Sequence, residues 1–148
     1  MDDRAWTVLY DAECGLCRVL LALLLHWDRT GRPRGPGSGT SAAHRGRLRP
    51  LPLQRAEAQT LLADLPLGER MASWHLVSPA GARWSAGAAA APLLRLLPGG
   101  GGVAAVFARF PNATERGYRW VADHRSGLGR FVPSGLRRRA DYLHCGSP

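Results

Sequence analysis

The feature that most constrains this chain is the run from Trp6 to Trp27, where a short apolar segment leads into two closely spaced cysteines and then a longer apolar segment. Trp6–Tyr10 (WTVLY) combines β-branched, aromatic and aliphatic residues and is ended by Asp11, which predicts a buried strand. From Cys14 onward, apolar residues recur at spacings of three and four, which predicts a helix. Its expected inward stripe is Leu16, Val19, Leu20, Leu23, Leu24 and Trp27.

Cys14 and Cys17 form a C-x-x-C pair at the first turn of this helix, and such a pair can be redox-active, half of a zinc site or structural. The first turn has unpaired N–H groups and the positive end of the helix dipole, which favour a thiolate. Positions i and i+3 share a helix face, so Cys17 is expected to lie under Cys14, close enough to bond with it. We predict Cys14 as the exposed attacking thiol and Cys17 as the shielded resolving thiol, with Gly15 leaving room for a partner and Arg18 able to stabilise the thiolate.

Asp11 precedes Cys14 by three residues and has two interpretations. As a structural residue it caps the turn or the helix by accepting backbone N–H bonds, which is the favoured role for an aspartate between a strand and a helix. As a catalytic residue it accepts the proton of the resolving cysteine, which requires burial. Asp11 is therefore a candidate site residue together with Cys14 and Cys17.

The two alternatives to redox chemistry have less support. A zinc site needs a second pair of ligands, and the only candidates, His144 and Cys145, are adjacent residues that cannot easily both reach one tetrahedral centre. A structural role for two buried thiols is common in proteins and stays open. We predict no metal and no cofactor.

Length and composition indicate one compact domain in a reducing compartment. The chain has 148 residues with 45% hydrophobic content, and its three cysteines are too few and odd in number for a disulfide framework. The N-terminal MDDRAWTVLY is acidic where a signal peptide is basic, and the longest apolar run, Val19–Leu25, is too short to span a bilayer. We expect a soluble, cytoplasmic monomer that does not act at a membrane.

The net charge of +9 and the pI near 11.1 suggest nucleic-acid binding at first sight. However, all 20 lysine-or-arginine residues are arginine, they are scattered, and no aromatic RNA-binding signature accompanies them. The densest group, Leu136–Tyr142 (LRRRADY), is expected to be a solvated segment. Nucleic acid is therefore an unlikely partner.

The rest of the chain predicts alternating strands and helices. Residues 30–46 are rich in Gly, Pro, Ser and Arg and predict a flexible insertion. The prolines in the strand expected at Leu48–Leu53 favour a sheet edge. The other expected elements are a helix at Arg55–Leu65, a hairpin of Trp74–Val77 and Arg83–Trp84 around Pro79–Gly81, and helices at Ala86–Leu97, Val103–Phe110 and Asn112–His124, with Gly99–Gly102 as a linker.

Several segments of the chain carry a family resemblance. Tyr10–Cys17 (YDAECGLC) resembles the D-x-x-C-x-x-C signature of the DCC family, also called DUF393. The resemblance continues through LRPLPLQ at Leu48–Gln54, the hairpin and helix of His75–Gly99, and YRWVADHR at Tyr118–Arg125. Nearly the whole chain is covered, with Thr30–Gly46 as an insertion.

The resemblance implies a thioredoxin-like α/β fold, a mixed four-stranded sheet flanked by helices with extra C-terminal helices, in one domain over residues 1–148. It places Asp11, Cys14 and Cys17 at the family's signature positions and Arg125 at its C-terminal arginine. It implies a thiol-disulfide oxidoreductase whose partner is a protein or a low-molecular-weight thiol or disulfide. The alternative is a non-enzymatic binding module of the same fold with structural or metal-binding cysteines.

Two departures from ordinary thioredoxins concern the active region. Leu16 replaces the proline usual between the two cysteines, and Ala72 and Ser73 stand where thioredoxins place a cis-proline. Among the histidines, only His75 lies on a strand where it warrants comparison with the cysteines.

Overall fold

The strand predicted at Trp6–Tyr10 is an inner strand of a four-stranded sheet in the computed structural model of the chain. The structure describes residues 5–30, 47–131 and 135. The flexible insertion was predicted at residues 30–46, but Thr30 is the last residue of the first helix. Residues 31–46 lie outside the described residues, and so do Leu136–Tyr142, His144 and Cys145. The elements are β1 (Trp6–Tyr10), α1 (Gly15–Thr30), β2 (Leu48–Pro52), α2 (Ala56–Leu61), α3 (Leu67–Ala72), β3 (His75–Val77), β4 (Arg83–Ser85), the 3-10 helix η1 (Ala86–Ala89), α4 (Ala90–Leu96), α5 (Gly101–Arg109) and α6 (Pro111–Phe131).

The sheet is mixed, in the order β2-β1-β3-β4. β1 pairs with β2 in parallel and with β3 antiparallel, and β3 pairs antiparallel with β4. Because parallel neighbours need a crossover connection, the chain passes through α1 between β1 and β2. β2 contains Pro50 and Pro52 and is an edge strand, as its sequence predicts. This arrangement confirms the expected α/β fold of the thioredoxin-like type.

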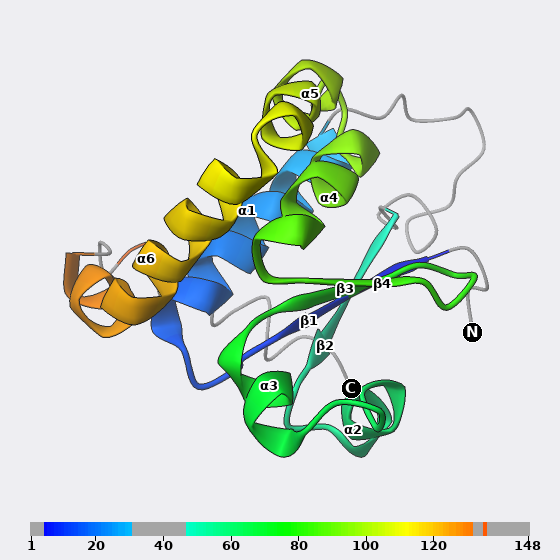
Figure 1. Cartoon of the computed structure of the whole chain (residues 1–148), viewed down its shortest axis with the longest axis vertical. Coiled ribbons are helices and arrows are strands. Elements are labelled where there is room, and N and C mark those ends of the chain that lie inside the picture. Colours follow the sequence, from blue (N-terminus) through cyan, green and yellow to red (C-terminus); the bar gives the residue numbers. More distant parts are fainter. Residues whose placement is uncertain (1–4, 31–46, 132–134, 136–148) are drawn as a thin grey trace.

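The core is divided between the two faces of the sheet, because successive side chains of a strand point to opposite sides. Val8 and Tyr10 of β1 face the side covered by α1 and α4, where Leu21 and Leu93 pack against them. Leu9 faces the other side, where the core residues are Leu51, Leu53, Ala58, Leu62 and Val77. Figure 1 shows α2 and α3 on this second side, with α1, α4, α5 and α6 on the first.

The helices differ in extent from those predicted. The helix expected at Arg55–Leu65 ends at Leu61, and a second helix that was not predicted, α3, follows after Pro66. This difference arises because Pro66 occupies the position before the first residue of α3, where a proline is tolerated. The glycines expected to form a linker contribute Gly101 and Gly102 to α5, and α6 runs to Phe131 instead of ending near His124. Within the described ranges, no helix is both long and apolar enough to cross a membrane.

The inward stripe predicted for α1 is largely wrong. Val19 is buried as expected, but the other buried residues of α1 are Leu21, Leu25 and Asp28. Leu20 and Leu23 are 46% and 50% exposed. Helix α1 is apolar nearly all round, so its periodicity fits more than one inward face, and packing against the sheet selects the face of Leu21 and Leu25.

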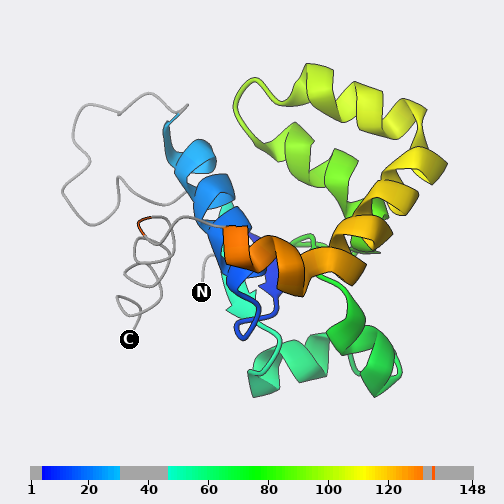
Figure 2. The same ribbon diagram turned by 90° about the vertical axis from the view of Figure 1, so that its left-hand side faces the viewer.

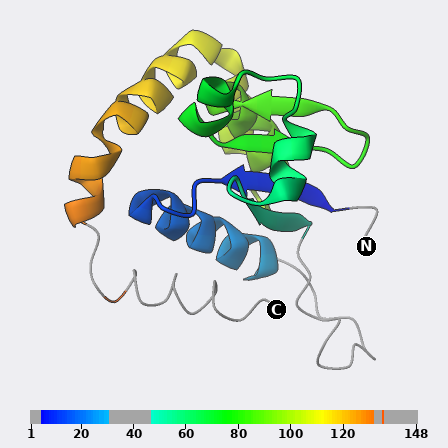
Figure 3. The same cartoon turned by 90° about the horizontal axis from the view of Figure 1, so that it is seen from below.

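Helix α6 lies on the same side of the sheet as α4 and α5 and extends to α1 (Figures 2 and 3). Its position is fixed by η1, which packs against it. The N–H of Gly87 donates a hydrogen bond to Glu115 Oε2 at 3.0 Å, and a Cβ added at Gly87 would lie 2.7 Å from the Glu115 Cα. The absence of a side chain at Gly87 therefore permits the close approach of α6.

We expect Gly87→Ala to lower the free energy of unfolding by about 1–3 kcal/mol, because the clash is with the backbone of α6 and cannot be relieved by a side-chain rotation. Urea unfolding measures this change. The matched control is Gly117→Ala in α6, where an added Cβ has nothing within 4 Å. That variant is expected to gain about 0.5–1 kcal/mol from helix propensity. Equal effects of the two substitutions would contradict the packing of η1 on α6.

Candidate active site

The turn between β1 and α1 is held by Asp11 and Gln54. Asp11 Oδ1 accepts the N–H of Glu13 at 2.9 Å and the Nε2–H of Gln54 at 2.9 Å. Gln54 Oε1 in turn accepts the N–H of Ala12 at 3.3 Å. Asp11 thus makes the backbone hydrogen bond expected of a turn-capping residue. Gln54 follows the end of β2, so pairing of β2 with β1 brings it to this turn.

Cys14 lies immediately before α1, at the N-cap position. Its carbonyl oxygen accepts the N–H of Arg18 at 3.1 Å, the bond of a helical turn. Its Sγ accepts the N–H of Cys17 at 3.3 Å, so the sulfur takes the place that a serine or aspartate oxygen takes at other helix starts. The sequence predicted Cys14 as an exposed thiol in the first turn of the helix. In the structure Cys14 directly precedes the first helical residue and is half-buried. An N–H donor and the helix dipole both favour negative charge on this sulfur.

Cys17 lies one turn into α1 and is also half-buried, with both cysteines present as free thiols. The pKa of the Cys17 thiol is raised to about 12, mainly by burial and in addition by the hydrogen bond with Cys14 and the charges of Cys14 and Asp11. The positive charge of Arg125 acts in the opposite direction and lowers the pKa of Cys17. Cys17 is therefore protonated at neutral pH. A protonated thiol is a poor nucleophile, because the thiolate is the reactive form.

Arg125 comes from α6, more than a hundred residues after the cysteines, and lines the same cleft as Cys17. Among the described residues whose charges act on Cys17, Arg125 is the one that favours the thiolate. The structure thus brings together Asp11, Cys17 and Arg125. The sequence suggested that the positive charge of Arg18 acts on the thiols. In the structure burial raises the pKa of Tyr10, and the charge of Arg18 opposes this rise.

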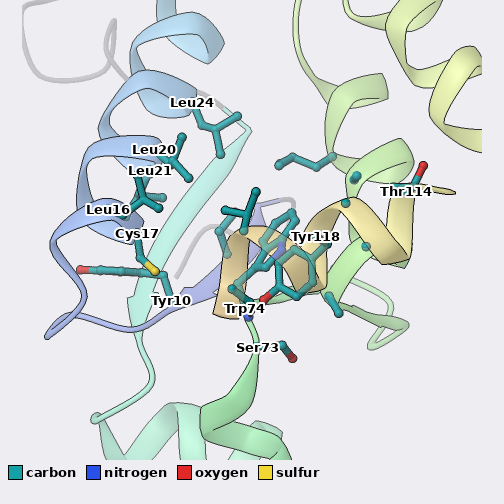
Figure 4. A pocket seen from close by; sticks show the side chains of 18 of the residues that line it. Tyr10, Leu16, Cys17, Leu20, Leu21, Leu24, Ser73, Trp74, Thr114 and Tyr118 are labelled. Atoms are coloured by element: carbon teal, nitrogen blue, oxygen red, sulfur yellow. Dashed lines mark hydrogen bonds between the residues drawn. The ribbon is translucent and has the colours of Figure 1, made fainter. Parts of the chain in front are cut away.

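A cleft of about 830 Å³ opens beside Cys17. Its walls come from α1 on one side and from α5 and α6 on the other, and its floor from β1, η1 and α4. Figure 4 shows Cys17, Leu20 and Leu24 of α1 on one side and Trp74 and Tyr118 on the other. Most of the lining is apolar, and Cys14 is not part of it.

His75, the histidine singled out in the sequence, does not line this cleft. It is buried, with Nε2 3.0 Å from the carbonyl oxygen of Arg70 and Nδ1 2.7 Å from Ser85 Oγ. Burial lowers the pKa of His75 below its ordinary value. It is therefore a satisfied core histidine. Among the residues that the structure describes, no group of three His, Cys, Asp or Glu side chains is arranged to hold a metal ion.

A family model described as DCC1-like thiol-disulfide oxidoreductase matches residues 8–131. The chain belongs to this family. The match begins within β1 and ends with the last residue of α6, so both cysteines, Asp11 and Arg125 lie inside the DCC1-like region. The comparisons with curated proteins and with solved structures gave no match.

Two polar residues of the site, Gln54 and Tyr118, have roles that no pattern in the sequence predicts. Gln54 orients Asp11 and the turn. The only feature of the sequence that could have indicated this role is the position of Gln54 at the end of a strand parallel to β1. Tyr118 accepts the N–H of Trp74 through its hydroxyl at 3.3 Å and lies on the wall opposite Cys17. No local spacing relates it to the cysteines, because α6 reaches them only through tertiary packing.

We expect iodoacetamide at pH 8 to label Cys14 well before Cys17 in the reduced protein. With a pKa of about 12, about one Cys17 in 10,000 is a thiolate at pH 8, against about one in ten for an ordinary thiol with a pKa of 9.0. Because the thiolate is the reactive form, Cys17 labelling should rise about tenfold per pH unit between pH 8 and pH 11. Peptide mapping by mass spectrometry on a Cys145→Ser background measures both rates. Faster labelling of Cys17 would reverse the assignment of the two thiols.

Proposed function

We propose that this DCC1-like protein exchanges disulfides with a partner, with Cys14 attacking and Cys17 resolving. The observation that carries the proposal is the N-cap geometry, in which the Cys17 N–H donates to the Cys14 Sγ at 3.3 Å. This geometry stabilises a thiolate at Cys14 and places the second thiol one helical turn away on the same face.

In the first step, the Cys14 thiolate attacks one sulfur of the partner's disulfide, forming a mixed disulfide and releasing the partner's other sulfur as a thiolate that takes up a proton. In the second step, Cys17 gives up its proton and attacks the Cys14 Sγ. The Cys14–Cys17 disulfide forms and the partner's first sulfur leaves as a thiol. The partner is reduced by two electrons and the protein is oxidised by two, and the same steps run in reverse with a dithiol partner.

The environment of Cys17 supports this order of events. Burial is the main reason that its pKa is raised, but the hydrogen bond and the charge of Cys14 add to the shift. Once Cys14 is in a mixed disulfide its sulfur is neutral, so both of these contributions are lost, while the opposing charge of Arg125 remains. Cys17 therefore becomes easier to ionise after the first attack, when its thiolate is needed.

The proposed partner is a protein or a low-molecular-weight thiol or disulfide, and the proposed location is the cytoplasm. A protein in that compartment meets a reducing glutathione pool, which favours the dithiol form at rest. The direction of electron flow then follows from the reduction potential of the pair.

A redox titration tests the proposal. The full-length protein carrying Cys145→Ser is equilibrated in glutathione buffers of graded potential, quenched by alkylation and weighed by intact mass spectrometry. We expect a reversible two-electron transition, with loss of two hydrogens and of both alkylation sites. The Cys14→Ser variant on the same background is the control and should show no such transition. Thiols that never pair, or zinc retained in the mass, would favour the binding module with structural or metal-binding cysteines.

A further inference from the structure

The apolar side chains on the walls of the cleft are unusually exposed. Among the described residues, large apolar side chains with high exposure gather in the cleft: Leu20, Leu23, Trp27, Val106, Phe107 and Phe110. Leu23 is 50% exposed and Val106 is 58% exposed. Water-exposed apolar surface that is concentrated in a concave site is typical of a binding site, because covering it is favourable.

The volume and the distribution of polar groups favour a small molecule. A volume of about 830 Å³ lies in the range of small-molecule sites, about 300–1,000 Å³. The polar end contains Cys17, Asp11 and Arg125, whereas the α5 side of the cleft presents Val106 and Phe107. Such a site suits an elongated molecule with one polar end and one apolar end.

The main chain around the floor of the cleft is already hydrogen-bonded. The N–H of Trp74 donates to Tyr118 Oη, that of Ala86 to the Trp74 carbonyl oxygen, and that of Gly87 to Glu115 Oε2. The walls are helices, whose backbone groups bond within the helix. An extended peptide in the cleft would find these main-chain groups already occupied, and leaving its own amides unpaired costs free energy. A hydrocarbon chain has no such groups.

The polar end selects the charge of the ligand. Arg125 presents a guanidinium group, which suits a carboxylate because its donors form a planar fork. Asp11 lies at the same end, but its Oδ1 is engaged by the Glu13 N–H and by Gln54 Nε2. The cation is therefore the group that matches the head of a ligand.

We propose that the cleft binds a long-chain carboxylate, with its hydrocarbon chain between α1 and α5 and its carboxylate beside Arg125 and Cys17. This site goes beyond the exchange of disulfides, because binding requires no thiol chemistry. A bound carboxylate covers Cys17 from the cleft side while leaving Cys14 outside it, since Cys14 does not line the cleft.

Displacement of a fluorescent fatty acid by palmitate, held below its aggregation concentration, tests the site in the full-length protein carrying Cys14→Ser. This background keeps the cleft and removes the attacking thiol, so failure of the proposed exchange reaction leaves the result unaffected. We expect saturable binding at one site. Leu23→Glu should weaken it at least about tenfold, because a carboxylate would be placed in the apolar wall. Leu67→Glu is the matched control: Leu67 is 66% exposed on α3 and outside the cleft, and binding should be unchanged.

Two further measurements test the binding of the ligand's carboxylate, and neither changes the apolar wall of the cleft. Arg125→Gln should weaken palmitate binding about tenfold and leave binding of the uncharged alcohol of the same length unchanged. In the protein with native Cys14 and Cys17, saturating palmitate should slow alkylation of Cys17 at pH 10 at least about fivefold, as expected for a covered thiol.

Three outcomes would overturn the proposal. The first is no saturable binding, and the second is equal weakening by Leu23→Glu and Leu67→Glu. The third is a concentration-dependent dimer in sedimentation equilibrium that Leu23→Glu dissociates, which would assign the cleft to a second copy of the chain. Circular dichroism of each variant shows whether it is folded, and the alkylation measurement needs no variant in the cleft.

Discussion

Replacing Cys14 by serine is expected to lower the rate of thiol-disulfide exchange at least about a hundredfold, because a hydroxyl at this position is not ionised and cannot attack a disulfide. The serine oxygen can still accept the N–H that now points to the sulfur, as N-cap serines do, so the helix start is preserved. Reduction of a small aromatic disulfide followed by absorbance measures the rate. Unfolding in urea should show a free energy close to that of the parent protein.

Replacing Cys17 by serine separates the two thiols. This variant keeps the attacking sulfur, so it should still react once with a disulfide but accumulate the mixed disulfide at Cys14. Intact mass spectrometry after incubation with oxidised glutathione detects the adduct. If Cys14→Ser forms the adduct and Cys17→Ser does not, the roles are exchanged. Cys145→Ser in both proteins removes the third thiol.

Replacing Leu9 by alanine is expected to lower the free energy of unfolding by about 2–5 kcal/mol. Leu9 is fully buried on an inner strand, where it packs in the same cluster as Leu53 and Leu62. Removal of its three terminal carbons leaves a cavity that neighbouring strands and α2 cannot easily fill. Denaturant unfolding monitored by circular dichroism measures the change.

The control for Leu9 is the same substitution at Leu67, which is 66% exposed on α3. An exposed leucine has little burial to lose, so Leu67→Ala should change the free energy of unfolding by less than about 0.5 kcal/mol. A loss at Leu67 as large as at Leu9 would contradict the difference in burial between these two leucines.

The strands were the most predictable part of the fold. β1 coincides with the predicted Trp6–Tyr10, and the prolines of β2 correctly indicated an edge strand. Strands of this length are recognised by their composition, and proline acts on the strand ladder locally. The breaks between helices were less predictable, because the proline preceding α3 is compatible with both a helix end and a new helix start.

Only the part of the site that is formed by residues close together in the sequence could be predicted. The spacing of Cys14 and Cys17, the turn at Asp11 and the start of a helix are set within eight residues, and the hydrogen bond between the two cysteines follows from helix geometry. Gln54 could not be recognised, because its role depends on which strand β2 pairs with. Arg125 was found through the family resemblance and not through any local pattern.

By itself the sequence determined the C-x-x-C motif and its placement after a buried strand, because the period of a helix and the preferences of a turn act over a few residues. Only the tertiary structure decided which face of α1 is buried. The apolar period of α1 fits several faces, and packing against β1 and α4 chose Leu21 and Leu25 and left Leu20 and Leu23 on the wall of the cleft. The hydrophobic period of a helix indicates which side chains share a face. Which segments pack against that face depends on contacts with distant parts of the chain, here α5 and α6.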